Sequence, residues 1–244
     1  MLNIYRETMI LRTCDCDFTG AWRPSAVLIA MQEAAGAHSD ALGCGRDDLL
    51  KGGIVWVLNR CEVHMQAYPG VGDAVTVETF PMPLRRWFFP RYYRFLDAEG
   101  KEAGCGATLW TLFDIGQRRM VPPGEWAARI PDNSDLTPPM GLPGSVELVE
   151  GPEESMTRTP QYFDLDVNGH VNNTRYADWA CDALGVDVMR AYQLAAFRVN
   201  YDAEIRPEQE ITLKKTVNGQ QFRVAGYHEG KMHFEVGGDL APRR

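Results

Sequence analysis

The densest group of polar residues in this 244-residue chain lies at 164–173, which reads DLDVNGHVNN. Within it a carboxylate, an amide and an imidazole stand at every second position, as Asp166, Asn168 and His170. If residues 164–170 are extended, alternation places these three side chains on one face. A carboxylate can act as base or nucleophile, while an amide and an imidazole can position a water molecule or hold an oxyanion. The spacing is therefore typical of acyl chemistry at a carbonyl.

The same segment also has a purely structural interpretation. Asp, Asn and Gly are common in loops, and Asn172 or Asn173 can cap the helix that follows. His170 would then be a histidine with structural hydrogen bonds. The local pattern leaves both interpretations open.

An earlier stretch of the chain helps to separate them. Residues 15–22, DCDFTGAW, match residues 164–171 at a constant offset of 149 (164 minus 15), with identity at both aspartates and the glycine. The copy has Thr and Ala in place of Asn168 and His170. Asp and Gly thus indicate shared architecture, whereas Asn168 and His170 are specific to the second half, which alone is equipped for chemistry.

The match extends to a second pair of segments and predicts an internal repeat. Val63–Val77 aligns with Val199–Leu213 at an offset of 136. Eight of the fifteen prolines lie between Pro122 and Pro160, in a stretch without helical or strand periodicity. We therefore predict three parts: an N-terminal domain at 1–125, a proline-rich linker at 126–155 and a C-terminal domain at 156–244.

Each half reads as one helix followed by several strands. Apolar residues recur at helical spacing from Pro24 to Gly43, and a second helix is predicted from about Asn173. Helix followed by antiparallel strands, repeated, predicts an α+β fold with each sheet wrapped on a helix. The predicted strands are 54–66, 73–80, 86–96 and 103–114 in the first half, and 194–204, 209–217, 220–227 and 231–237 in the second.

Composition excludes several classes of protein. The net charge of −8 argues against a nucleic-acid partner, and no run approaches the roughly 18 apolar residues of a membrane span. The N-terminus lacks the apolar core of a secretion signal, and six cysteines in a chain of this size indicate reduced thiols. We expect a cytoplasmic protein without a metal site.

At this point the chain resembles the fatty acyl-ACP thioesterase family, and the resemblance covers nearly its whole length. It implies two tandem hot-dog domains, each a long helix wrapped by an antiparallel sheet, and no cofactor. The matching residues are Asp164–Asn173 with Tyr176 and Trp179, Gln32–Ala35 with Leu42 and Gly43, Val55–Leu58, and Trp110 with Phe113 and Asp114.

The resemblance implies catalytic roles for Asp166, Asn168 and His170, and it adds Glu204, which falls where the family has an acidic residue. The next position is often Cys in plant members and is Ile205 here, which argues against a cysteine nucleophile at this point. A positioned carboxylate can direct a water molecule at a thioester or attack it to form an anhydride. We favour water attack, with either Asp166 or Glu204 as the base.

An acyl tail needs an apolar wall, which the resemblance assigns to the N-terminal domain. Met31, Ala35 and Trp56 are the candidates, although small helix residues also allow close packing on a sheet. The acidic acyl carrier protein needs a basic surface. The candidates are Arg85, Arg86 and Arg91, backed by Arg118, Arg119, Lys214 and Lys215, although a strand with a charged solvent face explains much of this pattern.

The expected function is hydrolysis of fatty acyl-ACP thioesters to free fatty acid and holo-ACP. An acyl-CoA thioesterase of the hot-dog type and a non-catalytic acyl-binding hot-dog module are the alternatives. The absence of a Gly-rich phosphate loop favours a carrier protein over CoA. The sequence leaves the chain length open, and a homodimer is compatible with it but not required.

Overall fold

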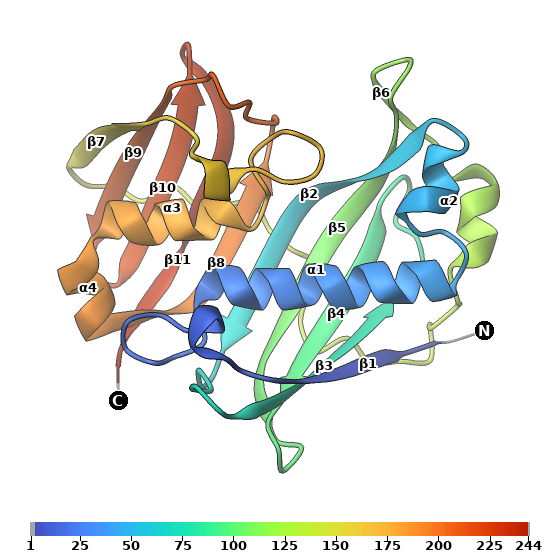
Figure 1. The fold of residues 1–244 in the computed structure, drawn as a ribbon, viewed down its shortest axis with the longest axis horizontal. Coiled ribbons are helices and arrows are strands. Elements are labelled where there is room, and N and C mark those ends of the chain that lie inside the picture. Colours follow the sequence, from blue (N-terminus) through green and yellow to red (C-terminus); the bar gives the residue numbers. More distant parts are fainter. Residues whose placement is uncertain (1–2, 244) are drawn as a thin grey trace. The chain divides into compact units, whose positions relative to one another are not determined.

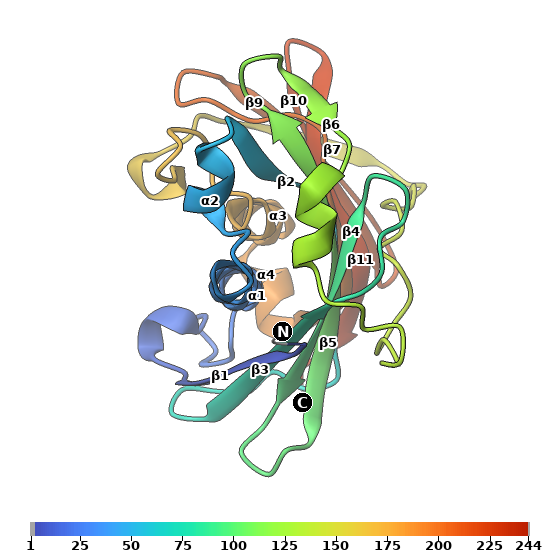
Figure 2. The same cartoon turned by 90° about the vertical axis from the view of Figure 1, so that its right-hand side faces the viewer.

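The computed structural model describes residues 3–243 and divides into two compact units, with the boundary between Pro143 and Gly144. In each unit a helix lies against an antiparallel sheet (Figure 1), and Figure 2 gives a second view of the same elements. The predicted α+β class is therefore confirmed.

Unit 1 holds a sheet in the order β1-β3-β4-β5-β2, with the short β6 paired to β5. Long α1 lies against it, followed by the short α2. The bounds are β1 Tyr5–Ile10, α1 Pro24–Ala41, α2 Arg46–Leu50, β2 Ile54–Met65, β3 Ala74–Pro81, β4 Phe89–Leu96, β5 Glu102–Asp114 and β6 Arg119–Val121, with 3-10 turns η1 at Thr13–Asp15 and η2 at Gly124–Arg129.

Unit 2 repeats this arrangement, since its sheet runs β7-β9-β10-β11-β8. Taken in chain order, each of these strands occupies the position of its counterpart in unit 1. The internal repeat is thus a repeat of topology. The bounds are β7 Glu153–Arg158, η3 Tyr162–Asp164, α3 Arg175–Leu184, α4 Val186–Ala191, β8 Tyr192–Tyr201, β9 Ile211–Asn218, β10 Gln221–His228 and β11 Lys231–Pro242.

The central helix of each unit is held by large buried side chains. In unit 1, Met31 of α1 lies directly over Gly106, where a Cβ atom would come within 2.9 Å of the Met31 Cε atom. In unit 2, the ring of Tyr176 on α3 stacks on Phe234 of β11 with centroids 4.1 Å apart. Each unit thus has its own core between helix and sheet.

Both ends of the predicted linker are packed against their own unit. Asn133 is fully buried and donates to the carbonyls of Asn3 and Pro81 in unit 1. In unit 2, Arg198 of β8 pairs with Glu147 at 2.6 Å. Within residues 3–243 no helix is long and apolar enough to cross a membrane.

Candidate active site

The polar segment of unit 2 is a tight turn. Its ends are joined by an antiparallel bridge between Leu165 and Val171, and the Asp166 N–H donates to the His170 carbonyl at 2.9 Å. Gly169 takes the left-handed φ of +82° that closes the turn. The expectation that an extended strand aligns the three polar side chains is therefore wrong, because the chain turns back between Asp166 and His170.

The carboxylate of Asp166 stabilises this turn. One oxygen accepts the backbone N–H of Asn168 at 2.8 Å, and the other accepts the Asn168 Nδ2 amide at 3.2 Å. In unit 1, Asp17 makes the equivalent bonds to the backbone N–H and hydroxyl of Thr19, at 2.8 and 2.6 Å. The interpretation of the aspartate as shared architecture fits this geometry.

His170 lies between two carboxylates. Its Nε2 atom is 3.3 Å from Oε2 of Glu204, while its Nδ1 atom is 3.8 Å from Oδ1 of Asp166, which is beyond hydrogen-bond range. The other oxygen of Glu204 accepts a hydrogen bond from Nη2 of Arg206 at 3.1 Å. About half of the Glu204 side chain (47%) is exposed, so water can reach the carboxylate.

Backbone hydrogen bonds bring Glu204 to the turn from a segment far along the chain. The Val171 N–H donates to the carbonyl of Ile205 at 2.9 Å, which fixes the loop after β8 beside the turn. His233 Nδ1 donates to the Glu204 carbonyl at 2.9 Å. The structure thus gathers all four predicted catalytic residues in unit 2.

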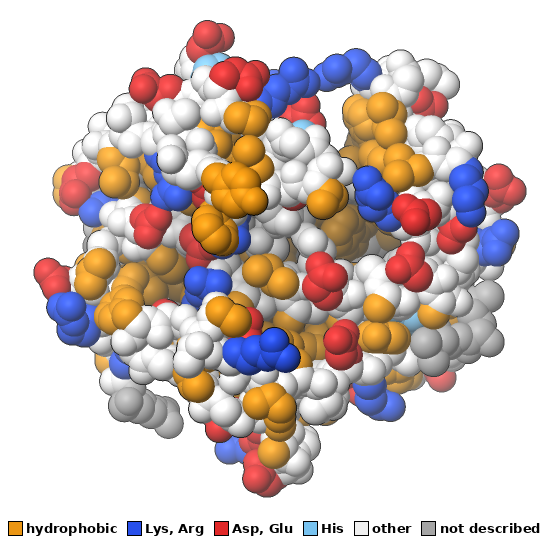
Figure 3. Space-filling model, viewed as in Figure 1, with side chains coloured by type: hydrophobic (Ala, Val, Ile, Leu, Met, Phe, Trp, Pro, Cys, Tyr) orange, Lys and Arg blue, Asp and Glu red, His pale blue; other side chains and the backbone are white. Residues whose placement is uncertain are grey.

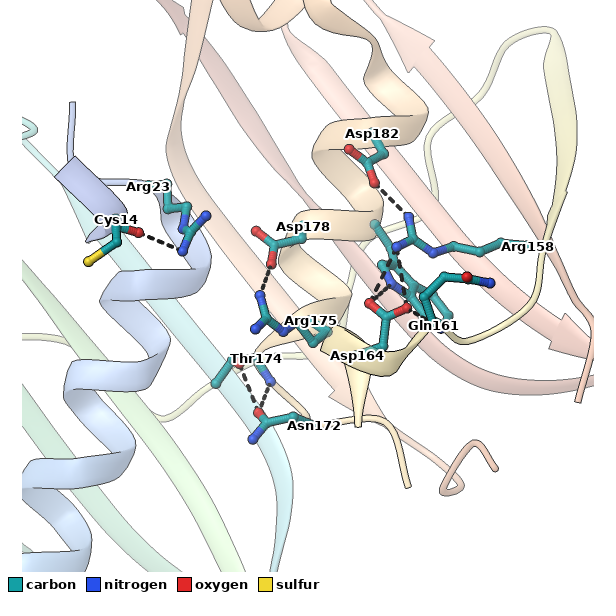
Figure 4. Close-up of polar contacts among 11 residues, drawn as sticks. Cys14, Arg23, Arg158, Gln161, Asp164, Asn172, Thr174, Arg175, Asp178 and Asp182 are labelled. Atoms are coloured by element: carbon teal, nitrogen blue, oxygen red, sulfur yellow. Dashed lines mark hydrogen bonds and ion pairs between the residues drawn. The ribbon is translucent and has the colours of Figure 1, made fainter. Parts of the chain in front are cut away.

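A buried carboxylate anchors the turn to α3, as Figure 4 shows. Asp164 accepts the indole N–H of Trp179 at 2.9 Å and the backbone N–H of Gln161 at 2.7 Å, and it pairs with Arg158 at 3.3 Å. Asn172 then accepts the backbone N–H and hydroxyl of Thr174 at the start of the helix. The sequence analysis assigned Asp164 and its counterpart Asp15 to shared architecture, but it did not predict the contact with Trp179.

Tyr176 of α3 carries part of the family resemblance, but the sequence analysis gave it no role in the site. Burial raises the pKa of its hydroxyl, and the charges of Asp166 and Glu204 raise it further. The phenol therefore stays protonated beside the two carboxylates, where it can act as a hydrogen-bond donor.

Exposed apolar side chains flank the turn. Tyr162, Phe163 and Val167 are 88%, 78% and 89% exposed. In Figure 3, hydrophobic side chains gather over the segment between β7 and α3. A ligand that approaches His170 across this face meets apolar surface.

The three predicted pocket residues of unit 1 lie in its interior or at its edge. Met31 and Ala35 are buried on α1, and the half-buried Trp56 of β2 donates its indole N–H to the Cys44 carbonyl at 2.9 Å. The ring of Trp56 meets Phe89 edge-on at 4.7 Å. These are packing contacts within unit 1, and a role of the three residues in binding an acyl chain stays a prediction.

The predicted basic docking surface is split by the structure. Arg85 and Arg86 are exposed in a tight hairpin closed by reciprocal backbone bonds between Arg85 and Phe88 at 3.0 Å. Arg91 is 6% exposed and donates to His38 and Thr79 in the interior. The prediction that Arg91 belongs to the docking surface is therefore wrong. In the described part of the chain, no group of three His, Cys, Asp or Glu side chains is placed to hold a metal ion.

The repeated helix-and-sheet units define a tandem hot-dog fold, and solved structures share it. An acyl-ACP thioesterase from Bacteroides thetaiotaomicron aligns over 98% of both chains with a TM-score of 0.89 and 21% identity. The 12:0-ACP thioesterase from Umbellularia californica aligns over 98% of both chains with a TM-score of 0.84 and 22% identity.

Family models identify the chain more closely. The acyl-ACP thioesterase N-terminal domain matches residues 2–125 and the C-terminal domain matches residues 150–237, so the chain belongs to the acyl-ACP thioesterase family. Curated relatives include a chloroplastic dodecanoyl acyl-carrier-protein hydrolase from Cinnamomum camphora, 24% identical over 97% of this chain. A palmitoyl-acyl carrier protein thioesterase from Cuphea hookeriana is 23% identical over 99% of it. The chain spans 65% and 61% of the lengths of these two relatives.

Proposed function

We propose that the protein hydrolyses fatty acyl-ACP thioesters to free fatty acid and holo-ACP. The observation that carries the proposal is the approach of Glu204 to His170, at 3.3 Å, beside the turn that presents Asn168. Membership of the acyl-ACP thioesterase family and the activities for which the relatives are named support it.

Glu204 is the better candidate for the base. Both oxygens of Asp166 accept hydrogen bonds from Asn168, as the oxygen of Asp17 does from Thr19 in a turn without a histidine. The oxygens of Glu204 contact Arg206 and His170, but 47% of its side chain is exposed compared with 19% of the Asp166 side chain, so water reaches Glu204 more readily. In this mechanism Glu204 takes a proton from the attacking water while the water oxygen bonds to the thioester carbon.

The remaining residues serve the tetrahedral intermediate. One N–H of the Asn168 amide bonds Asp166, which leaves the second N–H to donate to the oxyanion. Collapse of the intermediate breaks the C–S bond, and the carrier thiolate recovers the proton from Glu204. His170 orients the carboxylate from its Nε2 side. The anhydride route, in which a carboxylate attacks the thioester, is the second mechanism.

The proposal also assigns the binding of the acyl chain and of the carrier protein to unit 1. The acyl chain would lie in unit 1 along Met31, Ala35 and Trp56, and the acidic carrier would dock on Arg85 and Arg86. All six cysteines are free thiols in the structure, which supports the expected cytoplasmic location.

The test is turnover of a series of acyl-ACP and acyl-CoA substrates by the wild type and by His170→Ala. We expect the wild type to release fatty acid from acyl-ACP with a higher kcat/KM than from acyl-CoA, and the variant to bind substrate but turn it over slowly. Faster acyl-CoA hydrolysis would identify an acyl-CoA thioesterase. Binding without turnover in the wild type would identify an acyl-binding module.

A further inference from the structure

Arg91 is a buried cation in unit 1 to which the proposed mechanism gives no task. It lies on β4, on the sheet face turned toward α1, and its Nη1 atom donates to His38 Nδ1 at 3.0 Å and to Thr79 Oγ1 at 3.3 Å. Because a guanidinium has no acceptor atom, Nδ1 of His38 must be the acceptor in this bond. The imidazole is therefore neutral, with its proton on Nε2, and leaves the charge of Arg91 unbalanced.

No carboxylate of residues 3–243 lies within ion-pair distance of Arg91. Arg94, three residues further along β4 on the opposite face, pairs instead with Glu78 at 3.2 Å. A buried charge without a counter-charge is strongly unfavourable. Burial accordingly lowers the pKa of the Arg91 guanidinium.

Two nitrogens of Arg91 remain open to a ligand. Neither Nε nor Nη2 has a hydrogen-bond partner in the described part of the chain, in contrast to Nη1. Among residues 3–243, polar side-chain atoms that lack a partner and are also fully enclosed occur in Trp22, Arg23, Ser25, Asn133, Arg158 and Asn200. Nε and Nη2 of Arg91 are not among these enclosed atoms. These two donors therefore face space that a small polar group can reach.

A buried stripe of α1 leads from apolar side chains to this cation. Met31, Ala35 and His38 stand at i, i+4 and i+7, so they share one face of the helix, and all three are buried. Met31 covers Gly106 of the sheet, and His38 holds Arg91. A chain that follows this stripe from Met31 ends at a guanidinium.

We propose that Arg91, held by His38 and Thr79, is a carboxylate-binding subsite that receives the far end of an acyl chain carrying a terminal carboxylate. The proposal rests on the proposed function, because the acyl chain is that of the thioester substrate. Nε and Nη2 present the paired donors that a carboxylate accepts. A methyl end would displace water from the cation and return no hydrogen bond.

The kinetic test compares two thioesters of equal length, the mono-ACP thioester of dodecanedioate and dodecanoyl-ACP. We expect the wild type to favour the carboxylate-ended substrate by about tenfold or more in kcat/KM, as a charge-assisted pair predicts. Arg91→Met should abolish the preference, and Arg91→Lys should keep part of it. The matched control Arg94→Met removes an arginine from the other face of the same strand and should keep all of it. Equal kcat/KM values in the wild type, or an unchanged preference in Arg91→Met, would overturn the proposal.

A binding measurement tests the subsite without turnover. Calorimetric titration with free dodecanedioate should give at least about tenfold tighter binding to the wild type than to Arg91→Met, with folding of the variant checked by circular dichroism. If dodecanoate shows the same dependence on Arg91, the carboxylate that binds there is the head of a free fatty acid, and the proposal of a subsite for the far end is overturned. Equal affinities of wild type and variant for both acids overturn the subsite.

If no acyl-ACP is hydrolysed, the proposed function fails and the titration alone decides the inference. Should Arg91→Met not fold, Arg91→Lys and the two wild-type substrate ratios decide it.

Discussion

Replacing Glu204 by Gln separates the roles of the two carboxylates beside His170. The Gln side chain keeps the shape of Glu204 and an oxygen for the contact with His170, which is 3.3 Å in the wild type. Its amide cannot take a proton from water. A general base contributes about 10²–10⁴-fold to the rate, which is about 2.7–5.4 kcal/mol of activation free energy. We expect Glu204→Gln to lower kcat for acyl-ACP by that factor and to change KM little.

The comparison variant is Asp166→Asn. Its remaining oxygen can still accept the Asn168 backbone N–H, but its new amide group faces the amide of Asn168, so one hydrogen bond is lost at about 1 kcal/mol. We expect kcat to fall by about tenfold or less. Asp17→Asn is the control in unit 1. A single oxygen of Asp17 accepts both bonds from Thr19, so the Asn side chain can keep them, and we expect little change in stability or kcat.

The assay is steady-state hydrolysis of acyl-ACP, with thermal unfolding of each variant measured in parallel. If Asp166→Asn is folded and loses more kcat than Glu204→Gln, Asp166 is the base and the assignment of the two carboxylates is reversed. A large loss of kcat in Asp17→Asn would show that the assay reports turn stability instead of chemistry.

Three further predictions concern docking, stability and pH. Charge reversal at Arg85 and Arg86 should raise KM for acyl-ACP but not for acyl-CoA, and equal effects on both substrates would exclude this docking surface. Trp179→Phe removes the 2.9 Å bond to the buried Asp164 carboxylate and should lower the free energy of unfolding in urea by about 1.5–3 kcal/mol, whereas an unchanged midpoint would contradict the anchoring role. Burial lowers the pKa of His233 from its ordinary 6.5, so the folded state binds its proton less readily than the unfolded chain and stability should fall as the pH drops below that value. His233→Asn should flatten this part of the pH profile, and an unaltered slope would assign it to other groups.

The central elements were predictable because their sequence periodicity reflects burial on one or both faces. Pro24 marks the start of α1, and Gly43, with a φ of +69°, follows its end as predicted. The edge strands β1 and β7 were not predicted. Their side chains are mostly exposed, so neither strand carries the apolar alternation that reveals a strand.

The candidate site was predictable in composition but not in conformation. The offset of 149 identified the residues that differ between the two turns, and the structure places Asp166, Asn168 and His170 together. Alternation along an assumed strand gave the wrong reason, because Gly169 permits a turn that residue types alone leave undecided. Arg91 was misplaced since the arginines of 85–94 were read as one surface, whereas a spacing of three puts Arg91 and Arg94 on opposite faces of a strand.

The equivalence of the two turns extends to the residue that stands beside each of them. The Trp22 N–H donates to the Pro69 carbonyl as the Val171 N–H donates to that of Ile205, so Tyr68 occupies in unit 1 the place that Glu204 has in unit 2. The two turns therefore differ at the positions of Asn168, His170 and Glu204, and Thr19→Asn, Ala21→His and Tyr68→Glu would place the same three side-chain types beside the turn of unit 1. One backbone arrangement therefore serves both units, while the side chains that the proposed function uses stand in unit 2.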